Sequence, residues 1–316
     1  MSPKPLVAVT GGTGFLGLHL VPALAQAGFR LRLLARREPV HPAFAGVAFE
    51  TLPGSLEDDA ALVALVEGAD VVVHAAGLIK AHNRAAFLRA NQGGTAALAR
   101  ITRRVAPDAK FVLISSLAAR EPKLSNYAFS KHAAEDAARQ ELAPAQLAII
   151  RPPAIYGPWD RETLALFKAS LYPFAPLLSD GKAALIHAAD AAGAITAMAG
   201  EKFQPGCFAL ADDQPEGYAL PTLMQAAARA TGGHAKLLRL PKALVLSAGF
   251  CSGLLGGFRK TAPIFTLGKA REILHPDWSV HPAELLPREI YTPRIPLARG
   301  FAETAAWYRQ SGWLRG

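Results

Sequence analysis

The sequence predicts an α/β protein with a doubly wound parallel sheet and a smaller C-terminal lobe. Short apolar runs, typical of buried strands, alternate with amphipathic helical patterns from the N-terminus to about Arg151. A glycine-rich turn directly follows the first of these runs. The 316 residues suffice for one large domain, or for one domain and a lobe, and a hydrophobic content of 51% provides a sizeable core.

The first strand, turn and helix form the strongest local motif. Residues 6–9 (LVAV) have the pattern of a buried strand, the turn at 10–17 reads TGGTGFLG, and residues 15–27 have an amphipathic helical pattern. Glycines let the backbone approach a pyrophosphate closely, and the helix N-terminus adds free amides and a partial positive charge. This order of elements is the one that the dinucleotide-binding fingerprint requires. The alternative is a tight glycine turn without a ligand.

The next strand indicates which dinucleotide binds. Residues 29–34 (FRLRLL) form the expected second strand, after which an acidic residue would accept the ribose 2′-hydroxyl of NAD. Arg36 and Arg37 stand there instead, and two guanidiniums suit a 2′-phosphate. NADP(H) is therefore favoured, with NAD(H) as the alternative if the two arginines are merely solvated at a strand end.

The remaining elements continue the alternation. We expect strands at 47–49, 71–74, 110–114 and 147–150, and helices at 60–66, 84–104 and from about Tyr127 to residue 142. The carboxyl ends of parallel strands meet at one edge of a sheet, and ligands bind there. The candidate groups at that edge are the Gly11 turn, Gly77, Ser116 and residues 151–153.

Tyr127 and Lys131 can perform proton chemistry at this edge. Residues four apart on a helix share a face, so the phenol and the ammonium would be presented to one site. A free phenol titrates near about 10, and a fixed neighbouring cation favours the phenolate, which gives an acid/base group near neutral pH. Alone, this spacing also fits a solvated helix surface. It becomes evidence for a catalytic site only through its place in an ordered series of motifs.

Composition indicates which classes of binding partner and which cellular compartment to expect. The net charge of +9 suits anionic nucleotides or a membrane surface, but the sequence has no Lys/Arg block, so no nucleic-acid partner is expected. Cys207 and Cys251 lie far apart without metal-type spacing, so we expect no disulfide framework and no metal site, but two buried thiols in a reducing cytoplasm. The first strand begins within a few residues of Met1, which argues against a signal peptide and predicts a cytoplasmic protein.

Seven motifs follow one another in a fixed order over about 180 residues. They are TGGTGFLG (10–17), VVHAAG (72–77), NQGGT (91–95), ISS (114–116), YAFSK (127–131), RPPAIYGPWD (151–160) and IHAAD (186–190). On these motifs the chain resembles the extended short-chain dehydrogenase/reductase superfamily, which includes nucleotide-sugar epimerases and 3β-hydroxysteroid dehydrogenases.

The resemblance implies a Rossmann domain at 1–160, to which 186–212 returns, and a substrate lobe at 161–185 and 213–316. It also implies that Ser116 polarises the substrate oxygen, that Tyr127 transfers the proton, and that Lys131 holds the nicotinamide ribose and biases the tyrosine. The cofactor-binding residues that it implies are Gly11, Gly12, Thr13, Gly14, Phe15, Leu16, Gly17, Arg36, Arg37, Ser55, Leu56, Ala75, Ala76, Gly77, Asn91, Ile114, Ser115, Tyr127, Lys131, Pro152, Pro153, Ala154 and Ile155. Asn91 would support the central helix, or serve as a plain structural amide.

Departures from the family pattern bear on the substrate. Ser55 stands where an acid usually contacts adenine, and Tyr127 follows Ser116 by only eleven positions, whereas sugar epimerases have a longer segment there. Our main hypothesis is therefore an NAD(P)-dependent oxidoreductase that acts on a secondary alcohol or ketone of a relatively apolar small molecule. A nucleotide-sugar epimerase or dehydratase is the alternative. A dinucleotide-binding structural or assembly subunit is the non-enzymatic alternative, against which the retention of Ser116, Tyr127 and Lys131 argues.

The C-terminal lobe gives weaker indications. Helices are expected at 221–231 and 301–314, and an apolar stretch at 243–258 is closed by Arg259 and Lys260. This stretch is short for a membrane span. We expect a buried or hinge helix over the substrate cleft, with an interfacial segment on the inner face of a membrane as the alternative. From residue 240 onward the layout is similar to bacterial relatives of 3β-hydroxysteroid and dihydroflavonol reductases; monomer and homodimer both stay open.

Overall fold

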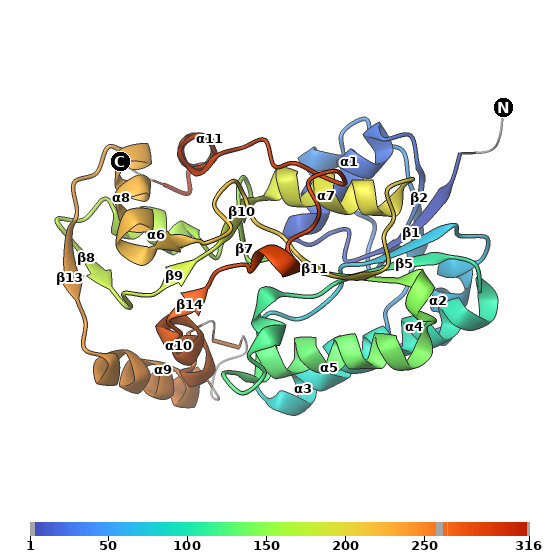
Figure 1. Ribbon diagram of the computed structural model, residues 1–316, viewed down its shortest axis with the longest axis horizontal. Coiled ribbons are helices and arrows are strands. Elements are labelled where there is room, and N and C mark those ends of the chain that lie inside the picture. Colours follow the sequence, from blue (N-terminus) through green and yellow to red (C-terminus); the bar gives the residue numbers. More distant parts are fainter. Residues whose placement is uncertain (1–3, 257–261, 264, 315–316) are drawn as a thin grey trace. The chain divides into compact units, whose positions relative to one another are not determined.

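The computed structural model describes residues 4–256, 262–263 and 265–314 (Figure 1). The chain forms two compact units. The first unit comprises Met1–Pro152, Ala191–Ala209 and Leu286–Thr292, and the second comprises Pro153–Asp190, Leu210–Leu285 and Pro293–Gly316. This division breaks the chain before the predicted boundary at residue 160, and it assigns 286–292 to the first unit. The assignment of a substrate lobe stays a prediction.

A parallel sheet forms the centre of the first unit, as predicted, and it has seven strands, one more than expected. In spatial order its strands are β11 (Gly206–Ala209), β6 (Leu147–Arg151), β5 (Lys110–Ile114), β4 (Val71–His74), β1 (Leu6–Thr10), β2 (Arg30–Ala35) and β3 (Glu50–Pro53). In the register, Thr10 of β1 lies beside Leu34 of β2 and His74 of β4. The carboxyl ends of the central strands therefore meet at one edge, where the predicted site residues follow.

Helices cover both faces of this sheet. They are α1 (Phe15–Gln26), α2 (Asp59–Val66), α3 (Arg84–Leu88), α4 (Gly94–Val105), α5 (Asn126–Glu141) and the part of α7 (Ala188–Ala199) that belongs to this unit. Figure 1 shows α2, α4 and α5 on one face and α1 on the other. Leu62, Leu98 and Phe111 are fully buried between the sheet and the first group of helices. Burial of such side chains is the main favourable contribution to the stability of this unit.

The predicted strand at 47–49 is wrong. The third strand is β3, which begins at Glu50 and pairs with β2. Residues 47–49 instead follow a 3₁₀ turn at Pro42–Phe44, and the ring of Phe49 packs edge-on against Phe44 at 5.5 Å between centroids. The apolar residues of this run thus serve a local aromatic contact, which a strand-like pattern does not distinguish from sheet pairing.

The second unit is built from small sheets and helices around an aromatic core. Its strands are β7 (Ala154–Tyr156), β8 (Phe174–Leu177), β9 (Lys182–Ala183), β10 (Leu185–His187), β12 (Tyr218–Ala219), β13 (Lys236–Arg239) and β14 (Asp277–Trp278). Its helices are α6 (Leu164–Ala169), α8 (Leu220–Thr231), α9 (Lys242–Gly256), α10 (Leu267–Leu274) and α11 (Leu297–Gln310). Tyr156, Phe167, Phe301 and Tyr308 are fully buried and pack ring against ring.

Two C-terminal predictions need correction. The last helix lies at Leu297–Gln310 and not at 301–314, because Pro296 occupies its N-cap and Gly312, at a φ of +70°, follows its end. Cys251 is exposed on α9, whereas Cys207 is half-buried, so the prediction of two buried thiols is wrong for Cys251. Phe258, Arg259 and Lys260 lie outside the described residues.

Candidate active site

The turn between β1 and α1 is closely packed at two glycines. Gly11 has a φ of +75°, and a Cβ there would lie 2.5 Å from the carbonyl carbon of Ala75. A Cβ on Gly17 would collide with the carbonyl oxygens of Gly11 and Gly12. Gly14, the N-cap of α1, has no side chain to cover the first amides of the helix. These features fit a diphosphate, which needs close backbone approach and exposed N–H groups.

A buried hydrogen-bond chain holds the ends of β1 and β4 together. Oγ1 of Thr10 lies 2.6 Å from Nδ1 of His74, and Nε2 of His74 lies 3.0 Å from Oγ1 of Thr95. Oγ1 of Thr95 donates to the carbonyl of Asn91, so Nε2 of His74 carries the proton and Nδ1 accepts from Thr10. Burial, and secondarily the charge of Lys131, lowers the pKa of His74 to about 3. His74 is therefore a neutral structural residue, a role that the motif VVHAAG alone did not indicate.

Asn91 supports the loop that follows β4. The predicted helix at 84–104 contains a π-helical turn at Arg89–Gly93, and Asn91 lies in it, fully buried. Its side chain accepts from the amide of Leu78 at 2.7 Å and donates to the Leu78 carbonyl at 3.0 Å. It also donates to Oγ of Ser130, which in turn donates to the carbonyl of Tyr127. Asn91 thus links the loop after β4 to the helix that carries Tyr127 and Lys131.

Lys131 is buried at the carboxyl end of β5. Its Nζ donates to the carbonyl of Ile114 at 2.6 Å, and it lies 3.7 Å from the point that a Cβ on Gly77 would occupy. Burial lowers the pKa of Lys131 to about 8, while the charge of Glu135 acts in the opposite direction. The ammonium therefore remains mostly protonated at neutral pH, in a fixed position beside the ends of β4 and β5.

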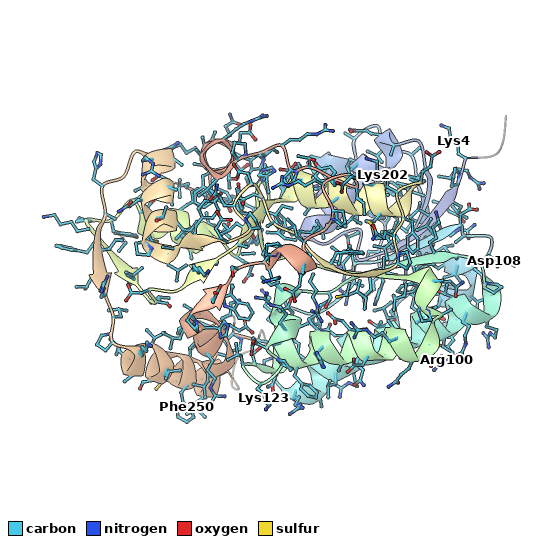
Figure 2. All side chains as sticks on the ribbon, viewed as in Figure 1. Lys4, Arg100, Asp108, Lys123, Lys202 and Phe250 are labelled. Carbon is cyan, nitrogen blue, oxygen red and sulfur yellow. The ribbon has the colours of Figure 1, made fainter. Side chains whose placement is uncertain are left out.

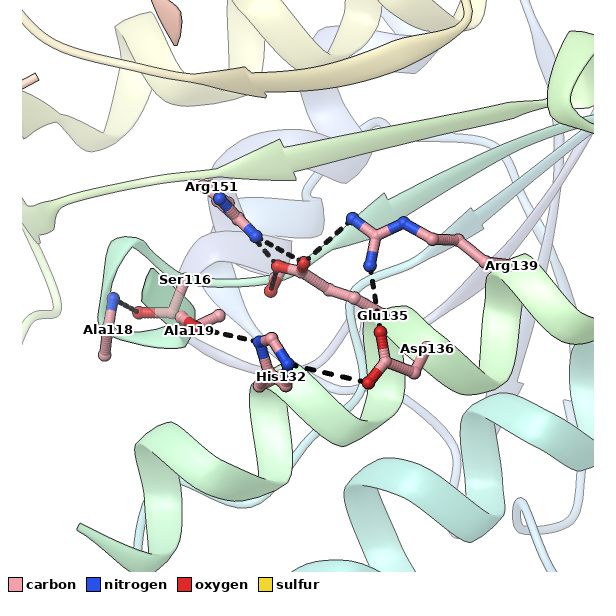
Figure 3. Close-up of polar contacts among 9 residues, drawn as sticks. Ser116, Ala118, Ala119, His132, Glu135, Asp136, Arg139 and Arg151 are labelled. Atoms are coloured by element: carbon pink, nitrogen blue, oxygen red, sulfur yellow. Dashed lines mark hydrogen bonds and ion pairs between the residues drawn. The ribbon is translucent and has the colours of Figure 1, made fainter. Parts of the chain in front are cut away.

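Glu135, one turn after Lys131 on α5, forms the charged anchor of this region (Figure 3). It is fully buried, accepts two hydrogen bonds from Arg151 at 2.8 and 2.6 Å, and accepts a third from Oγ of Ser115 at 2.5 Å. Burial opposes its charge, but the hydrogen bonds from Arg151 and Ser115 and the nearby guanidiniums, including that of Arg139, outweigh burial and lower its pKa. Glu135 therefore ties α5 to the ends of β5 and β6.

Ser116 and Tyr127 flank this anchor. Oγ of Ser116 accepts from the amide of Ala118 at 3.2 Å and caps a 3₁₀ turn at Leu117–Arg120. Tyr127 is half-buried in the first turn of α5, with its ring 6.2 Å from that of Phe87. The structure therefore places Ser116 at the end of β5, where Lys131 is held, and Tyr127 on the same helix as Lys131.

The predicted adenosine-side residues lie at the ends of β2 and β3. Arg36 and Arg37 are exposed just after β2, and within the described residues neither guanidinium has an ion pair or a hydrogen bond. Oγ of Ser55 accepts from the amide of Glu57 at 3.3 Å, and Leu56 packs against Gly94. Pro152 is the last residue of the first segment of the first unit, whereas Pro153, Ala154 and Ile155 belong to the second unit. Their contact with a cofactor stays a prediction.

Comparison with known proteins identifies the family. The model of the NAD dependent epimerase/dehydratase family matches residues 7–209. The chain belongs to this family. It is 46% identical to the ceramide reductase of Caulobacter vibrioides over 98% of this chain and 96% of the relative. This member of the family is an oxidoreductase of the extended short-chain dehydrogenase/reductase type, and its cofactor is a nicotinamide dinucleotide.

Solved structures agree with the fold. The UDP-N-acetylglucosamine 4-epimerase from Bacillus cereus matches with a TM-score of 0.65 and 18% identity, over 97% of each chain. The UDP-glucose 4-epimerase from Bifidobacterium longum, in complex with NAD+ and UDP, matches with a TM-score of 0.69 and 16% identity, over 98% of this chain and 99% of that one. At these identities the likeness concerns the fold.

Proposed function

We propose that this enzyme reduces the ketone of a long-chain N-acyl amino alcohol, a ceramide-type lipid, to a secondary alcohol. The observation that carries the proposal is the 46% identity with a ceramide reductase over nearly the whole of both chains. A ceramide has one secondary hydroxyl, beside the carbon that bears the amide nitrogen. Because an oxidoreductase of this type interconverts ketones and secondary alcohols, the carbon of that hydroxyl is where we expect reduction.

Apolar groups beside the candidate site support a lipid substrate. Leu78 and Ile79 follow Gly77 directly and are 41% and 56% exposed. Asn91 fixes the backbone of this loop through both the amide and the carbonyl of Leu78. A loop that presents two exposed apolar side chains suits an alkyl chain, and the exposed cation Lys80 follows them directly.

In the proposed mechanism, Tyr127 donates a proton to the ketone oxygen, and the hydroxyl of Ser116 donates a hydrogen bond to the same oxygen. The cofactor, when bound, supplies the hydride that adds to the carbonyl carbon. The Lys131 ammonium, held by the carbonyl of Ile114, stabilises the phenolate that Tyr127 becomes. The turn at Gly11 and the N-terminus of α1 would hold the diphosphate, and Lys131 would also bind the nicotinamide ribose.

We further propose that the cofactor is NADPH. Arg36 and Arg37 stand where an NAD-binding strand ends in an acid, and both are exposed. Their guanidiniums are available to a 2′-phosphate.

A reduction assay tests the function. An N-acyl amino alcohol with a ketone next to the amide-bearing carbon, and with short chains for solubility, is incubated with NADPH and the full-length protein. We expect loss of NADPH absorbance and a product that is heavier by two hydrogens. UDP-glucose, tested in parallel, should remain unchanged. If UDP-glucose is epimerised and the ketone is not reduced, the protein is an epimerase and the proposal is wrong.

A further inference from the structure

Helix α9 carries an apolar surface on its solvent side. Leu244, Phe250, Leu254 and Leu255 are 52%, 53%, 59% and 62% exposed, and Figure 2 shows Phe250 projecting away from the helix. At 100° per residue, the four side chains fall within one face of the helix, together with Ser247, Ala248 and Cys251. From Ala243 to Gly256 the helix contains no charged residue.

The opposite face of α9 is already occupied by protein. Val245 is buried, and a Cβ on Gly249 would lie 2.9 Å from the Cβ of Ala270 on α10. In soluble proteins, a surface helix that packs against the protein on one face normally carries polar side chains on the opposite face. Since α9 is apolar on both faces, its outer face is suited to an apolar environment and not to water.

Cations predominate in the segment that contains α9. Between Gly217 and Arg271 the sequence has eight Lys and Arg residues and no Asp or Glu, so this segment carries nearly all of the net charge of +9. Lys242 is exposed at the start of α9, and Arg271 is exposed on α10, which packs against it. Lys269, also exposed on α10, forms an ion pair with Glu272. An apolar helix face bordered by cations is complementary to an anionic lipid surface. Two copies of the chain would instead bring like charges together.

We propose that the outer face of α9 inserts into the interface of an anionic bilayer and holds the second unit there. The choice of a bilayer rests partly on the proposed function, because a two-chain lipid amide resides in a membrane. Among the described residues, no helix has the length and apolarity that a transmembrane span requires, so α9 lies in the plane of the interface. The insertion brings the enzyme to its substrate.

Vesicle sedimentation tests this inference without any catalytic assay. The full-length protein is mixed with vesicles of phosphatidylcholine, with and without phosphatidylglycerol. We expect binding to the anionic vesicles that weakens with salt. The variant Leu254→Glu/Leu255→Glu should bind at least about tenfold more weakly, because two apolar side chains are lost from the interface and two negative charges are added. The matched control is Tyr172→Glu/Phe174→Glu, at residues 65% and 64% exposed in the same unit but outside α9.

The control decides what a loss of binding means. Retained binding in the control supports insertion of α9, whereas an equal loss in both variants would show that net charge alone governs binding. No binding by the unmodified protein, or a dimer that the α9 variant converts to a monomer, would also overturn the inference. Reduction of a short-chain ketone in solution should be unaffected in the α9 variant, while reduction of a vesicle-bound ketone should fall. If neither ketone is reduced, the proposed function fails while sedimentation still tests α9.

Discussion

Proteins normally bury apolar side chains and expose charged ones, and helices α5 and α9 depart from this rule in opposite ways. On α5, Ser130 and Glu135 are fully buried and Lys131 is only 7% exposed, although all three are polar or charged. On α9, leucines and a phenylalanine face solvent. Charged side chains are rarely buried without partners, and large apolar patches rarely face water in monomeric proteins. Each departure therefore indicates a requirement other than stability.

The two helices differ in whether the protein itself supplies partners for these unusual side chains. The buried groups of α5 find their partners within the first unit: Lys131 bonds the carbonyl of Ile114, and Glu135 bonds Ser115 and Arg151. Among the described residues, no element covers the outer face of α9. Partners within the same unit indicate a preorganised site, whereas an uncovered apolar face indicates a partner outside the chain. Substitutions on α5 should therefore affect chemistry and folding, and substitutions on the outer face of α9 should affect neither.

The largest effect is expected at the proposed proton donor. Tyr127→Phe removes only the hydroxyl, so turnover of a ketone substrate should fall by about 10²–10⁴-fold, the usual contribution of a general acid. Cofactor affinity should be retained, because the helix and Lys131 are unchanged. Steady-state kinetics combined with cofactor titration measures both quantities. Unchanged turnover would assign the proton to Ser116 or to water.

The next effect concerns the buried anchor of α5. Arg151→Leu leaves the Glu135 carboxylate buried without its main partner, and loss of one member of such a pair costs about 3–5 kcal/mol. Urea denaturation should show this decrease in the free energy of unfolding. The double variant Glu135→Leu/Arg151→Leu should recover part of the loss, since no uncompensated charge remains. The single variant Glu135→Leu completes the comparison. If the double variant loses as much free energy of unfolding as the two single variants together, Glu135 and Arg151 are not coupled.

A third effect is the dependence of stability on pH. His74 has a pKa near 3 when folded, below its ordinary value of 6.5, so its contribution to stability is complete above about 6.5 and is lost as the pH falls toward 3. Between pH 6.5 and 5, the unmodified protein should lose about 1.4 kcal/mol per pH unit relative to the variant His74→Gln. The difference between the two proteins is the relevant quantity, because burial raises the pKa of Asp212 to about 6, which acts in the opposite direction. Parallel pH profiles of the two proteins would contradict this prediction.

These cases show which features could be predicted from the sequence. The glycine turn at Gly11 and the strand at 71–74 were predicted correctly, because both depend on residues adjacent in the chain. The anchor formed by Ser115, Glu135 and Arg151 was not, because its members come from three elements that only the sheet brings together. A signal was present, since Glu135 follows Lys131 by one helical turn and thus shares its face.

Similar limits apply to Asn91 and α9. The apolar pattern at 84–104 predicted one regular helix, but the π-helical turn depends on the bonds that Asn91 makes with Leu78 in another loop. For α9, an apolar stretch was evident, but its outer face was not, because a helix that is apolar all round has no polar face to mark the solvent side. The burial of Val245 and the packing of Gly249 against Ala270 define the inner face.

A smaller effect is expected for the exposed arginines. The variant Arg36→Ala/Arg37→Ala should lose its preference for NADPH over NADH. We expect the ratio of the two dissociation constants to change by about tenfold to a hundredfold, since solvent partly screens charge-assisted contacts at an exposed site. Fluorescence titration with each cofactor measures this ratio. Lys4→Ala, which also removes an exposed cation from the first unit, serves as the control. Equal affinities of the unmodified protein for both cofactors would refute the proposed preference.

The smallest effect sharpens the contrast within α9 itself. Leu254→Ala removes a side chain that is 59% exposed, so the free energy of unfolding should change by no more than about 0.5 kcal/mol. Val245→Ala, on the inner face of the same helix, should cost at least about 1 kcal/mol, because Val245 is 2% exposed and its removal leaves a cavity. Urea denaturation in the absence of lipid compares the two variants. If Leu254→Ala proves as destabilising as Val245→Ala, the outer face of α9 is covered by protein in solution, and it is not available to a membrane.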